Sequence, residues 1–275
     1  MQKTKTLTIL VLVLLFIPSC ANLGGTPFNE PTGPVISRIL KNGELVVGTT
    51  GSMPPLNMTN KKGEIIGMEA DLAKMIANAM EVKLRLKAMP FSELLPSLER
   101  GEVDMILSSM TITPSRNLKV AFVGPYYITG KAFLTKMERI ASAQRPSEIN
   151  NPNITLVALK GSTSQSFVEE AVPRAQLITT QNYDEAVRMV IEDKVNAMVA
   201  DYPICVVSVL RYPKAGMISV LTRMTFEPLG IALPANDPHL VNWTQNFLSV
   251  LQGTGKLEAL TQRWFGNRSW LRNLP

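Results

Sequence analysis

The stretch FSELLPSLERGEVDMILSSMTITPSR, residues 91–116, contains the pattern that decides the fold. Its first part, SELLPSLERG, predicts a short helix, and VDMILSSM predicts an apolar, buried strand. The strand then runs into hydroxyl side chains, a proline and Arg116. Helix, apolar strand and polar exit in this order are typical of an α/β layer in which the strand ends carry the site.

Similar units lie on both sides of this stretch. Strands and helices alternate before it as ELVVGTT, MEADLAKMIANAM and KLRLKAM. After a pause at AFVGPYYITGKAFLTK the alternation restarts as ITLVALKG, SQSFVEEAV, AQLITT, YDEAVRMVIEDK and VNAMVADYP. The final section holds the strand-like FEPLGIALP and two amphipathic helices, PHLVNWTQNFLSVLQ and GKLEALTQRWFG. The alternation predicts two α/β units, each with a mostly parallel sheet.

The N-terminus has the pattern of an export signal. Lys3 and Lys5 precede an apolar run that is too short to span a bilayer, and small residues lead to Cys20. We therefore expect a signal peptide over residues 1–19 and a tether over residues 20–34. The cysteine is placed as in bacterial lipoprotein signals, which predicts lipidation of Cys20. Ordinary cleavage close to Ala21 is the alternative.

The charge and the cysteines exclude several classes of function. The formal charge of +6 falls to +4 when Lys3 and Lys5 leave with the signal, and it is not concentrated in a block. Nucleic acid is therefore not expected as a partner. Cys205 lies in an apolar run and is expected to be a small buried residue. No cluster has metal-ligand spacing, so neither a metal nor a cofactor is expected.

Two of the predicted strand ends carry groups that suit an anion. Thr113 and Pro114 predict a helix start, whose free backbone amides attract negative charge, and Arg116 lies in the same first turn. An arginine fork can grip a carboxylate at two points. After the strand at 154–159, Gly161 permits a tight turn, and Ser162 and Thr163 are expected to open the next helix, which offers a second set of hydroxyls and free amides.

A third strand end carries an acid. Asp201 follows an apolar strand with no basic residue nearby in the sequence, so it could serve an ammonium group. A carboxylate cradle facing an acid would fit a free α-amino acid. Each residue also has a simpler interpretation: Arg116 as a solvated first-turn side chain, Asp201 as a helix N-cap, and Ser108 and Ser109 as partners of strand-end backbone groups.

The chain resembles the bacterial extracytoplasmic solute-binding proteins of family 3, which serve polar amino acid ABC importers. The resemblance covers nearly all of residues 38–267. It rests on the order and spacing of LVVGTTGSMPPL, IIGMEADLAKMIA, FSELLPSLERGEVDMILSSMTITPSR, FVGPYY, LKGSTSQ and PLGIAL.

The resemblance implies a two-lobed periplasmic-binding-protein fold with the ligand between the lobes. Lobe 1 would comprise residues 35–126 and 227–275, and lobe 2 residues 130–222. Two hinge crossings would lie near Tyr127–Thr129 and Met224–Glu227.

The resemblance also implies roles for individual residues. Arg116 would bind the ligand carboxylate and Asp201 its ammonium group. Phe91 and Met53 would flank the ligand side chain. The hydroxyls expected to assist are Ser108, Ser109, Thr111, Ser162 and Thr163.

Departures from the family pattern bear on the ligand. Relatives selective for cationic side chains often carry an acid shortly after the first strand, where this chain has Thr50 and Gly51. Met53, Phe91 and Met110 would make the pocket apolar and adaptable. We therefore expect an amino acid with a neutral side chain.

The expected function is binding without chemistry. The protein would work as a monomer in the periplasm or on the extracytoplasmic face of the membrane, held there by its lipid. It would close around the amino acid and deliver it to an ABC permease in the inner membrane. Two alternatives stay open: a ligand sensor for a signalling partner, and an enzyme like the cyclohexadienyl dehydratases, which would need an acid or base over the ligand.

Overall fold

The computed structural model describes residues 33–220 and 225–275. The predicted signal peptide, the lipidation site Cys20 and nearly all of the predicted tether therefore lie outside the described residues, as does Met224 of the second predicted crossing. Within the described residues, no helix is both long enough and apolar enough to cross a membrane.

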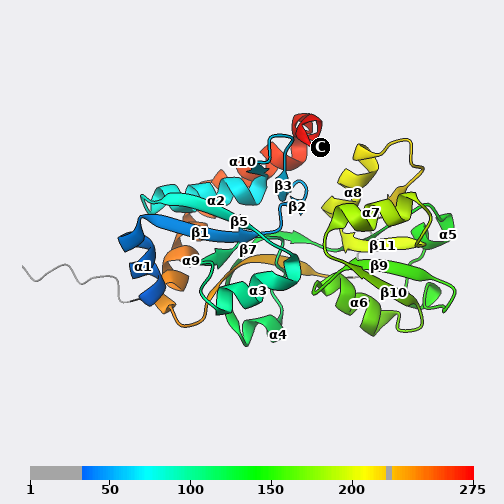
Figure 1. Cartoon of the computed structure of the whole chain (residues 1–275), viewed down its shortest axis with the longest axis horizontal. Helices are drawn as coiled ribbons and strands as arrows, with labels where there is room; N and C mark the ends of the chain where they lie inside the picture. Colours follow the sequence, from blue (N-terminus) through cyan, green and yellow to red (C-terminus); the bar gives the residue numbers. More distant parts are fainter. Residues whose placement is uncertain (1–32, 221–224) are drawn as a thin grey trace, which may run out of the picture. The chain divides into compact units, whose positions relative to one another are not determined.

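The first lobe contains a five-stranded sheet with the strand order β5-β1-β6-β13-β7 (Figure 1). The strands of this sheet are β1 (Glu44–Thr49), β5 (Lys83–Ala88), β6 (Met105–Ile106), β7 (Val120–Thr129) and β13 (Glu227–Pro234). A small sheet beside it contains β2 (Ser52–Met53), β3 (Asn57–Thr59) and β4 (Ile65–Ile66). Its helices are α1 (Pro34–Asn42), α2 (Met68–Ala79), α3 (Phe91–Glu99), α4 (Pro114–Asn117), α9 (Pro238–Gly253) and α10 (Lys256–Thr261), followed by the single turns η2 (Gln262–Gly266) and η3 (Ser269–Asn273).

The second lobe contains another five-stranded sheet, with the order β10-β9-β11-β8-β12. Its strands are β8 (Lys131–Thr135), β9 (Thr155–Leu159), β10 (Gln176–Thr180), β11 (Ala197–Asp201) and β12 (Ile218–Val220). Its helices are α5 (Glu138–Ala141), η1 (Pro146–Glu148), α6 (Thr163–Ala171), α7 (Tyr183–Ile191) and α8 (Tyr202–Arg211).

Both sheets are mixed. The strands of the predicted strand–helix–strand units pair in parallel: β5, β1 and β6 in one sheet, and β10, β9 and β11 in the other. The segment where the sequence pattern pauses forms β7 and β8, and these strands, with β13 and β12, add antiparallel pairs. The α/β class is confirmed, and each sheet is parallel on one side and antiparallel on the other.

The two sheets are joined where the chain passes from β7 to β8 and returns to β13. Only Gly130 separates β7 from β8. The returning chain lies against the outgoing one, because the Lys131 backbone N–H donates to Thr225 Oγ1 at 2.9 Å and Glu227 pairs with Thr129. A side chain at Gly130 would press on the Thr225 carbonyl oxygen, since an added Cβ would lie 3.0 Å from it. These joints place β11, α6 and the start of β13 next to the strand ends of lobe 1.

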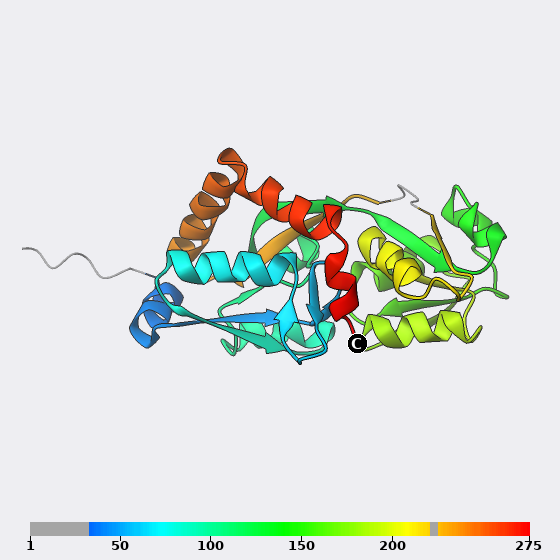
Figure 2. The ribbon, with the colours of Figure 1, turned by 90° about the horizontal axis from the view of Figure 1, so that it is seen from above.

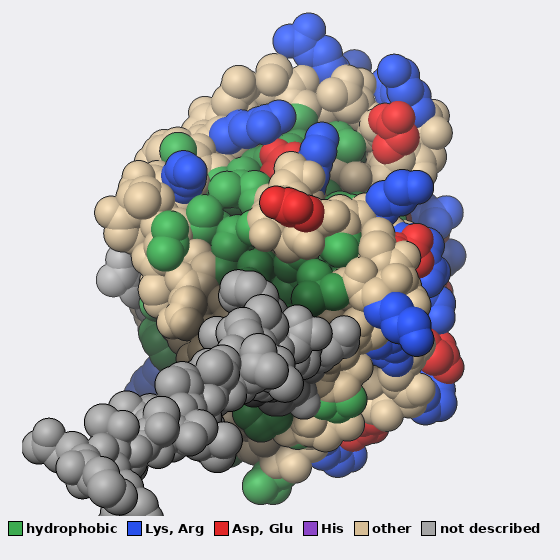
Figure 3. Space-filling model, turned by 90° about the vertical axis from the view of Figure 1, so that its left-hand side faces the viewer, with side chains coloured by type: hydrophobic (Ala, Val, Ile, Leu, Met, Phe, Trp, Pro, Cys, Tyr) green, Lys and Arg blue, Asp and Glu red, His purple; other side chains and the backbone are tan. Residues whose placement is uncertain are grey.

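Helices cover both faces of each sheet (Figures 1 and 2). In lobe 1 the apolar stripe of α2 buries Leu72, Ala73 and Ile76 against β1 and β5. Burial of a leucine or isoleucine side chain contributes about 1.5–3 kcal/mol. Lys and Arg side chains on the end of lobe 1 shown in Figure 3 are interspersed with Asp and Glu. The packing thus leaves the polar strand exits, and not the sheet faces, available for a site.

Candidate functional site: the cavity between the two lobes

A small cavity lies where the strand exits of the two lobes meet. It is lined by seven residues predicted for the site: Met53, Phe91, Ser109, Thr111, Ser162, Thr163 and Asp201. Three further residues line it: Lys131, Leu159 and Tyr183. Side chains from both lobes therefore converge on one place, as strand ends of α/β sheets do.

Local sequence explains how the two turns predicted to suit an anion form. Thr113 is the N-cap of α4, and its Oγ1 accepts from the Arg116 backbone N–H at 3.2 Å, with Pro114 at the first helical position. Ser162 is the N-cap of α6, and its Oγ accepts from the Gln165 backbone N–H at 3.3 Å. Both helix starts predicted from the sequence are confirmed.

Arg116 spans the two lobes beside the cavity. Its Nη1 donates to the Thr111 carbonyl oxygen at 2.9 Å, and its Nη2 donates to the Gly161 carbonyl oxygen of lobe 2 at 3.1 Å. Its guanidinium carbon lies 5.5 Å from the centre of the Phe91 ring, within the range of a cation–π contact. Burial lowers the pKa of Arg116, and the nearby Glu227 and Asp201 raise it in part.

Asp201 has a basic partner, which corrects the interpretation of an acid without one. Lys131 Nζ donates to Asp201 Oδ1 at 2.6 Å, and both side chains are buried. The two residues are 70 positions apart in the chain, but the antiparallel register of β8 and β11 places them opposite each other. Asp201 also occupies the N-cap position of α8, yet its side chain makes no capping hydrogen bond.

A second buried acid, Glu227, completes a charged cluster. Its Oε2 accepts from Thr111 Oγ1 at 2.8 Å and from Thr163 Oγ1 at 2.9 Å, and it lies 3.2 Å from Lys131 Nζ. Burial alone would raise the pKa of Glu227, but Lys131 and the two hydroxyls outweigh this and lower the pKa. Burial raises the pKa of Asp201, and Lys131 opposes the rise.

The two predicted serines after β6 have different surroundings. Ser108 does not line the cavity: its Oγ accepts from the Thr50 backbone N–H at 3.0 Å. Ser109 lines the cavity, and its backbone N–H donates to Glu69 Oε1 at 2.7 Å. Met110 is buried but does not line the cavity.

Sequence reasoning missed Lys131, Leu159 and Tyr183 as cavity residues. It also missed Glu227, which contacts the cavity residues Thr111, Thr163 and Lys131. Lys131 directly follows the crossing, and Glu227 opens the strand at the other crossing. A charged residue next to each crossing between the lobes, beside apolar strand residues, could have identified both as candidates for the site. Tyr183 is the first residue of α7, and the sequence does not distinguish it from a core aromatic.

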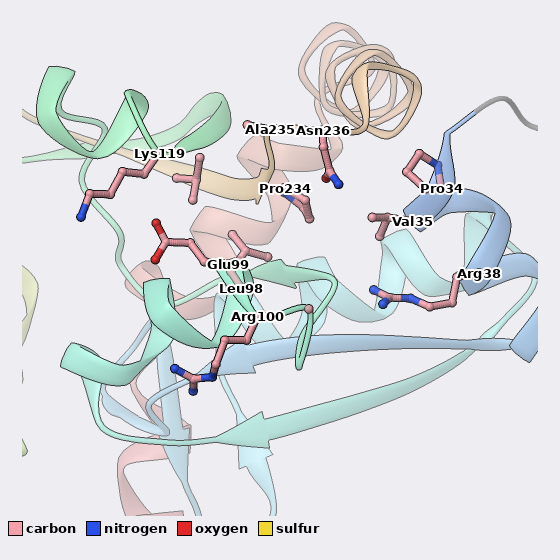
Figure 4. Close-up of a pocket in the computed structure, with 12 residues that line it drawn as sticks. Pro34, Val35, Arg38, Leu98, Glu99, Arg100, Lys119, Pro234, Ala235 and Asn236 are labelled. Atoms are coloured by element: carbon pink, nitrogen blue, oxygen red, sulfur yellow. The ribbon is translucent and has the colours of Figure 1, made fainter.

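A larger hollow on lobe 1, of about 410 Å³, contains none of the predicted site residues (Figure 4). Arg38, Arg100 and Lys119 line it, but Arg38 pairs with Asp104 and Arg100 pairs with Glu102, each at 2.6 Å. Within the described residues no group of His, Cys, Asp and Glu could hold a metal ion. The convergence of the predicted residues therefore favours the cavity between the lobes.

Two α/β lobes with a polar cavity between them define a solute-binding protein. The model for bacterial extracellular solute-binding proteins, family 3, matches residues 45–267, so the chain belongs to this extracytoplasmic family. The match confirms the resemblance seen in the sequence motifs.

Known proteins resemble this chain in structure and in sequence. The lysine-bound structure of a Wolinella succinogenes protein assigned as the binding component of an ABC transporter is 34% identical, with a TM-score of 0.79, and the match covers 84% of this chain and 99% of that chain. The glutamine-binding ABC transporter protein GlnH of Bacillus subtilis is 26% identical over 96% of this chain and 97% of its own.

Most relatives are binding proteins, and one is an enzyme. A cyclohexadienyl dehydratase of Pseudomonas aeruginosa is 22% identical over 85% of this chain and 87% of its own. Sequence similarity to this chain is therefore found both among binding proteins and in an enzyme.

Proposed function

We propose that this protein captures a free α-amino acid with an uncharged side chain and presents it to the permease of an ABC importer. The observation that carries the proposal is the convergence of seven predicted residues, from separate segments of both lobes, on one cavity. The binding proteins among its relatives support the general class. Those relatives bind different amino acids, so the choice of ligand rests on this chain's own residues.

The charges of the site favour a zwitterion. Arg116 and Lys131 supply two positive charges, and Asp201 and Glu227 supply two negative charges, so the site sums to zero. An α-amino acid with a neutral side chain leaves this balance unchanged, whereas a cationic or acidic side chain would bring an uncompensated charge into a buried site. The apolar parts of Met53, Phe91 and Leu159 fit a neutral side chain.

Binding requires the lobes to separate and close. The cavity measures about 10 Å³, which is close to the minimum for a single water molecule and far too small for an amino acid. Several contacts cross between the lobes here: Thr111 Oγ1 lies 3.3 Å from Thr163 Oγ1, and Arg116 bonds to Gly161. Glu227 of lobe 1 also contacts Thr163 and Lys131 of lobe 2. An arginine side chain has five N–H donors, so Arg116 can add a ligand carboxylate to its carbonyl contacts when the lobes close around it.

Calorimetric titration of refolded protein with the twenty amino acids tests the proposal. One or a few neutral amino acids should bind, and Arg116→Ala should weaken binding by tens to thousands of fold, since loss of one partner of a desolvated charge pair costs roughly 2–5 kcal/mol. Arg139→Ala, which changes an exposed arginine on α5, is the matched control and should bind normally. If none of the twenty amino acids binds, the proposed amino acid site is rejected.

Transport needs its own test. Uptake of the identified amino acid into vesicles that contain a permease from the same cell should depend on this protein. Binding without any effect on uptake would favour the sensing role.

Elimination chemistry is the second candidate, because Asp201 and Lys131 give the cavity an acid and a base beside the ligand position. One relative is a cyclohexadienyl dehydratase. Incubation with prephenate or arogenate separates the candidates: product formation that stops in Asp201→Asn would establish an enzyme, and no turnover would leave the binding role.

A further inference from the structure

A buried glutamate lies directly beneath the strand exit of lobe 1. Glu69, near the N-terminus of α2, is 1% exposed. Its Oε1 accepts from the Ser109 backbone N–H at 2.7 Å, from Ser109 Oγ at 3.4 Å and from the Tyr126 hydroxyl. Its Oε2 accepts from Asn57 Nδ2 at 2.5 Å. One carboxylate thus gathers hydrogen bonds from three segments of the lobe.

The backbone that Glu69 holds is strained. Ser109 has a φ of 51°, in the left-handed region that side chains other than glycine rarely adopt. Such a conformation persists only where surrounding contacts fix it. Ser109 lines the cavity. Two residues later, the Thr111 hydroxyl donates to Glu227 and the Thr111 carbonyl oxygen accepts from Arg116. The turn at Ser109 therefore sets where these groups lie.

Asn57 extends the same network to the other wall of the cavity. Its Oδ1 accepts from Thr50 Oγ1 and from the Gly51 backbone N–H, each at 2.8 Å. Asn57 also pairs with Met53 across β2 and β3, and Met53 lines the cavity. The loop that bears Met53 and the turn that bears Ser109 are thus connected through Glu69.

We propose that Glu69 is a positioning residue for the ligand site: it holds the Ser109 turn and the Met53 loop in the geometry that binds the amino acid. This inference rests on the proposed function. Glu69 does not line the cavity, so its effect on the ligand passes through the residues it holds. Burial raises the pKa of Glu69, and the hydrogen bonds from Tyr126, Ser109 and Asn57 lower it in part.

The hydrogen-bond pattern requires an acceptor at both oxygens. The Ser109 N–H and the Asn57 NH₂ are both donors, and they meet different oxygens of Glu69. In Glu69→Gln the new NH₂ group must face one of them. Rotating the Asn57 amide would not help, because its Oδ1 would leave Thr50 and Gly51 without their acceptor. Buried donors left without a partner carry a large cost.

Exchanging the amide and the carboxylate group between positions 57 and 69 restores the pattern of donors and acceptors. In the double variant Asn57→Asp with Glu69→Gln, the glutamine NH₂ can donate to the new aspartate, and its oxygen can still accept from Ser109. The other aspartate oxygen accepts from Thr50 and Gly51 as Asn57 Oδ1 does. Volume and net charge are nearly unchanged, so the double variant isolates the matching of donors and acceptors.

Calorimetry with the best-bound amino acid is the test, on wild type and three variants. We expect Glu69→Gln to weaken binding about tenfold or more, because it leaves a buried donor unpaired. The double variant should recover to within about threefold of wild type. The control is Glu64→Gln, an exposed glutamate that accepts from Asn60 Nδ2 at 2.9 Å, and it should bind normally. Hydrogen exchange at the Ser109 amide should speed up in Glu69→Gln and return to the wild-type rate in the double variant.

The outcomes separate the two proposals. If wild type binds and folded Glu69→Gln binds equally well, the positioning role is wrong while the proposed function stands. A double variant that folds but binds no better than the single variant also overturns it. Should Glu69→Gln not fold, recovery of folding and binding in the double variant supports the role. If wild type binds no amino acid, the proposed function itself fails, and the positioning role fails with it.

Discussion

At the residue scale, Lys131 controls the charge of the site. It is the only described lysine that is fully buried, and it neutralises part of the field of Asp201 and Glu227. Because the charges of Arg116, Lys131, Asp201 and Glu227 sum to zero, removing the Lys131 amine leaves a net charge of −1 on the cluster. The identity of residue 131 should therefore affect both the stability of lobe 2 and the choice of ligand.

We expect Lys131→Met to lower the stability of the protein by about 3–5 kcal/mol, since it leaves buried charge uncompensated. In the same variant, binding should shift from neutral amino acids towards lysine and arginine, whose side chains restore the balance. Thermal unfolding and calorimetry measure the two effects. Lys136→Met is the control, because that partly exposed lysine pairs with the exposed Asp193. An unchanged ligand preference in folded Lys131→Met would contradict the charge argument.

Acid should weaken binding through Asp201. Its pKa lies above the ordinary value of 3.8, chiefly because of burial. A bound ammonium group favours the ionised form, so the complex holds fewer protons than the free protein. Affinity should therefore be highest above the raised pKa and should fall as the pH decreases through it, earlier than for an exposed aspartate. Calorimetry between pH 7 and pH 4 checks this, and a flat profile would argue against an ammonium on Asp201.

At the element scale, helices and their caps can be predicted from the sequence, because the local pattern of residues determines them. The apolar spacing of α2, α7 and α9 and the caps Thr113 and Ser162 were read correctly, because helix periodicity and capping depend on neighbours in the chain. The helix α1 was missed, since its residues follow the Gly- and Pro-rich tether directly. Strand β6 covers only two residues of the predicted apolar strand, because the chain turns at Ser108 and Ser109.

The charged cluster could not be predicted in the same way. Lys131 meets Asp201 through the register of β8 with β11, and it meets Glu227 through the approach of two chain crossings. Strand register and the meeting of distant segments are properties of tertiary packing, which a single sequence does not encode locally. Arg116 and Thr163 were predicted because strand ends are recognisable from polar residues that follow apolar runs. Phe91 was predicted only through the resemblance to the family.

One side chain caps two helices of lobe 1. Asp237 Oδ2 accepts from the backbone N–H groups of Val35 and Ile36 at the start of α1, and Oδ1 accepts from Leu240 N–H at the start of α9. Asp237 is fully buried, and Gly33 leaves room for it, since an added Cβ would lie 1.9 Å from Oδ1. This aspartate joins the first helix to the last long one.

Asp237→Ala should therefore cost about 1–4 kcal/mol, because two caps are worth about 0.5–2 kcal/mol each. Asn182→Ala removes a single cap, that of α7, and should cost about half as much. Urea unfolding measures both free energies of unfolding, and ligand affinity should change in neither variant. Equal losses in the two variants would show that the double cap contributes no more than a single one.

At the scale of the whole molecule, the C-terminal segment connects the two lobes. It lies beyond residues 45–267, which match the family model. On lobe 1, Lys61 holds it twice: the Lys61 N–H donates to the Asn273 carbonyl at 2.9 Å, and Lys61 Nζ donates to the Arg272 carbonyl at 3.0 Å. On lobe 2, Arg211 of α8 donates to the Pro275 carbonyl at 2.9 Å. Figures 1 and 2 both show the segment beside α8.

This connection should favour the closed arrangement of the lobes. A contact made only when the lobes are closed adds to ligand affinity, since it offsets part of the cost of closing. Arg211→Ala should therefore weaken binding about three- to tenfold, as expected for a charge-assisted hydrogen bond that is partly exposed. Arg211 also pairs with Asp184 of its own lobe at 2.6 Å, so Asp184→Asn is the matched control and should bind within about twofold of wild type. Stopped-flow dissociation should show the loss as faster ligand release in Arg211→Ala alone. Equal effects of the two substitutions would mean that the loss comes from the Arg211–Asp184 pair within lobe 2, and not from the contact with the C-terminal segment.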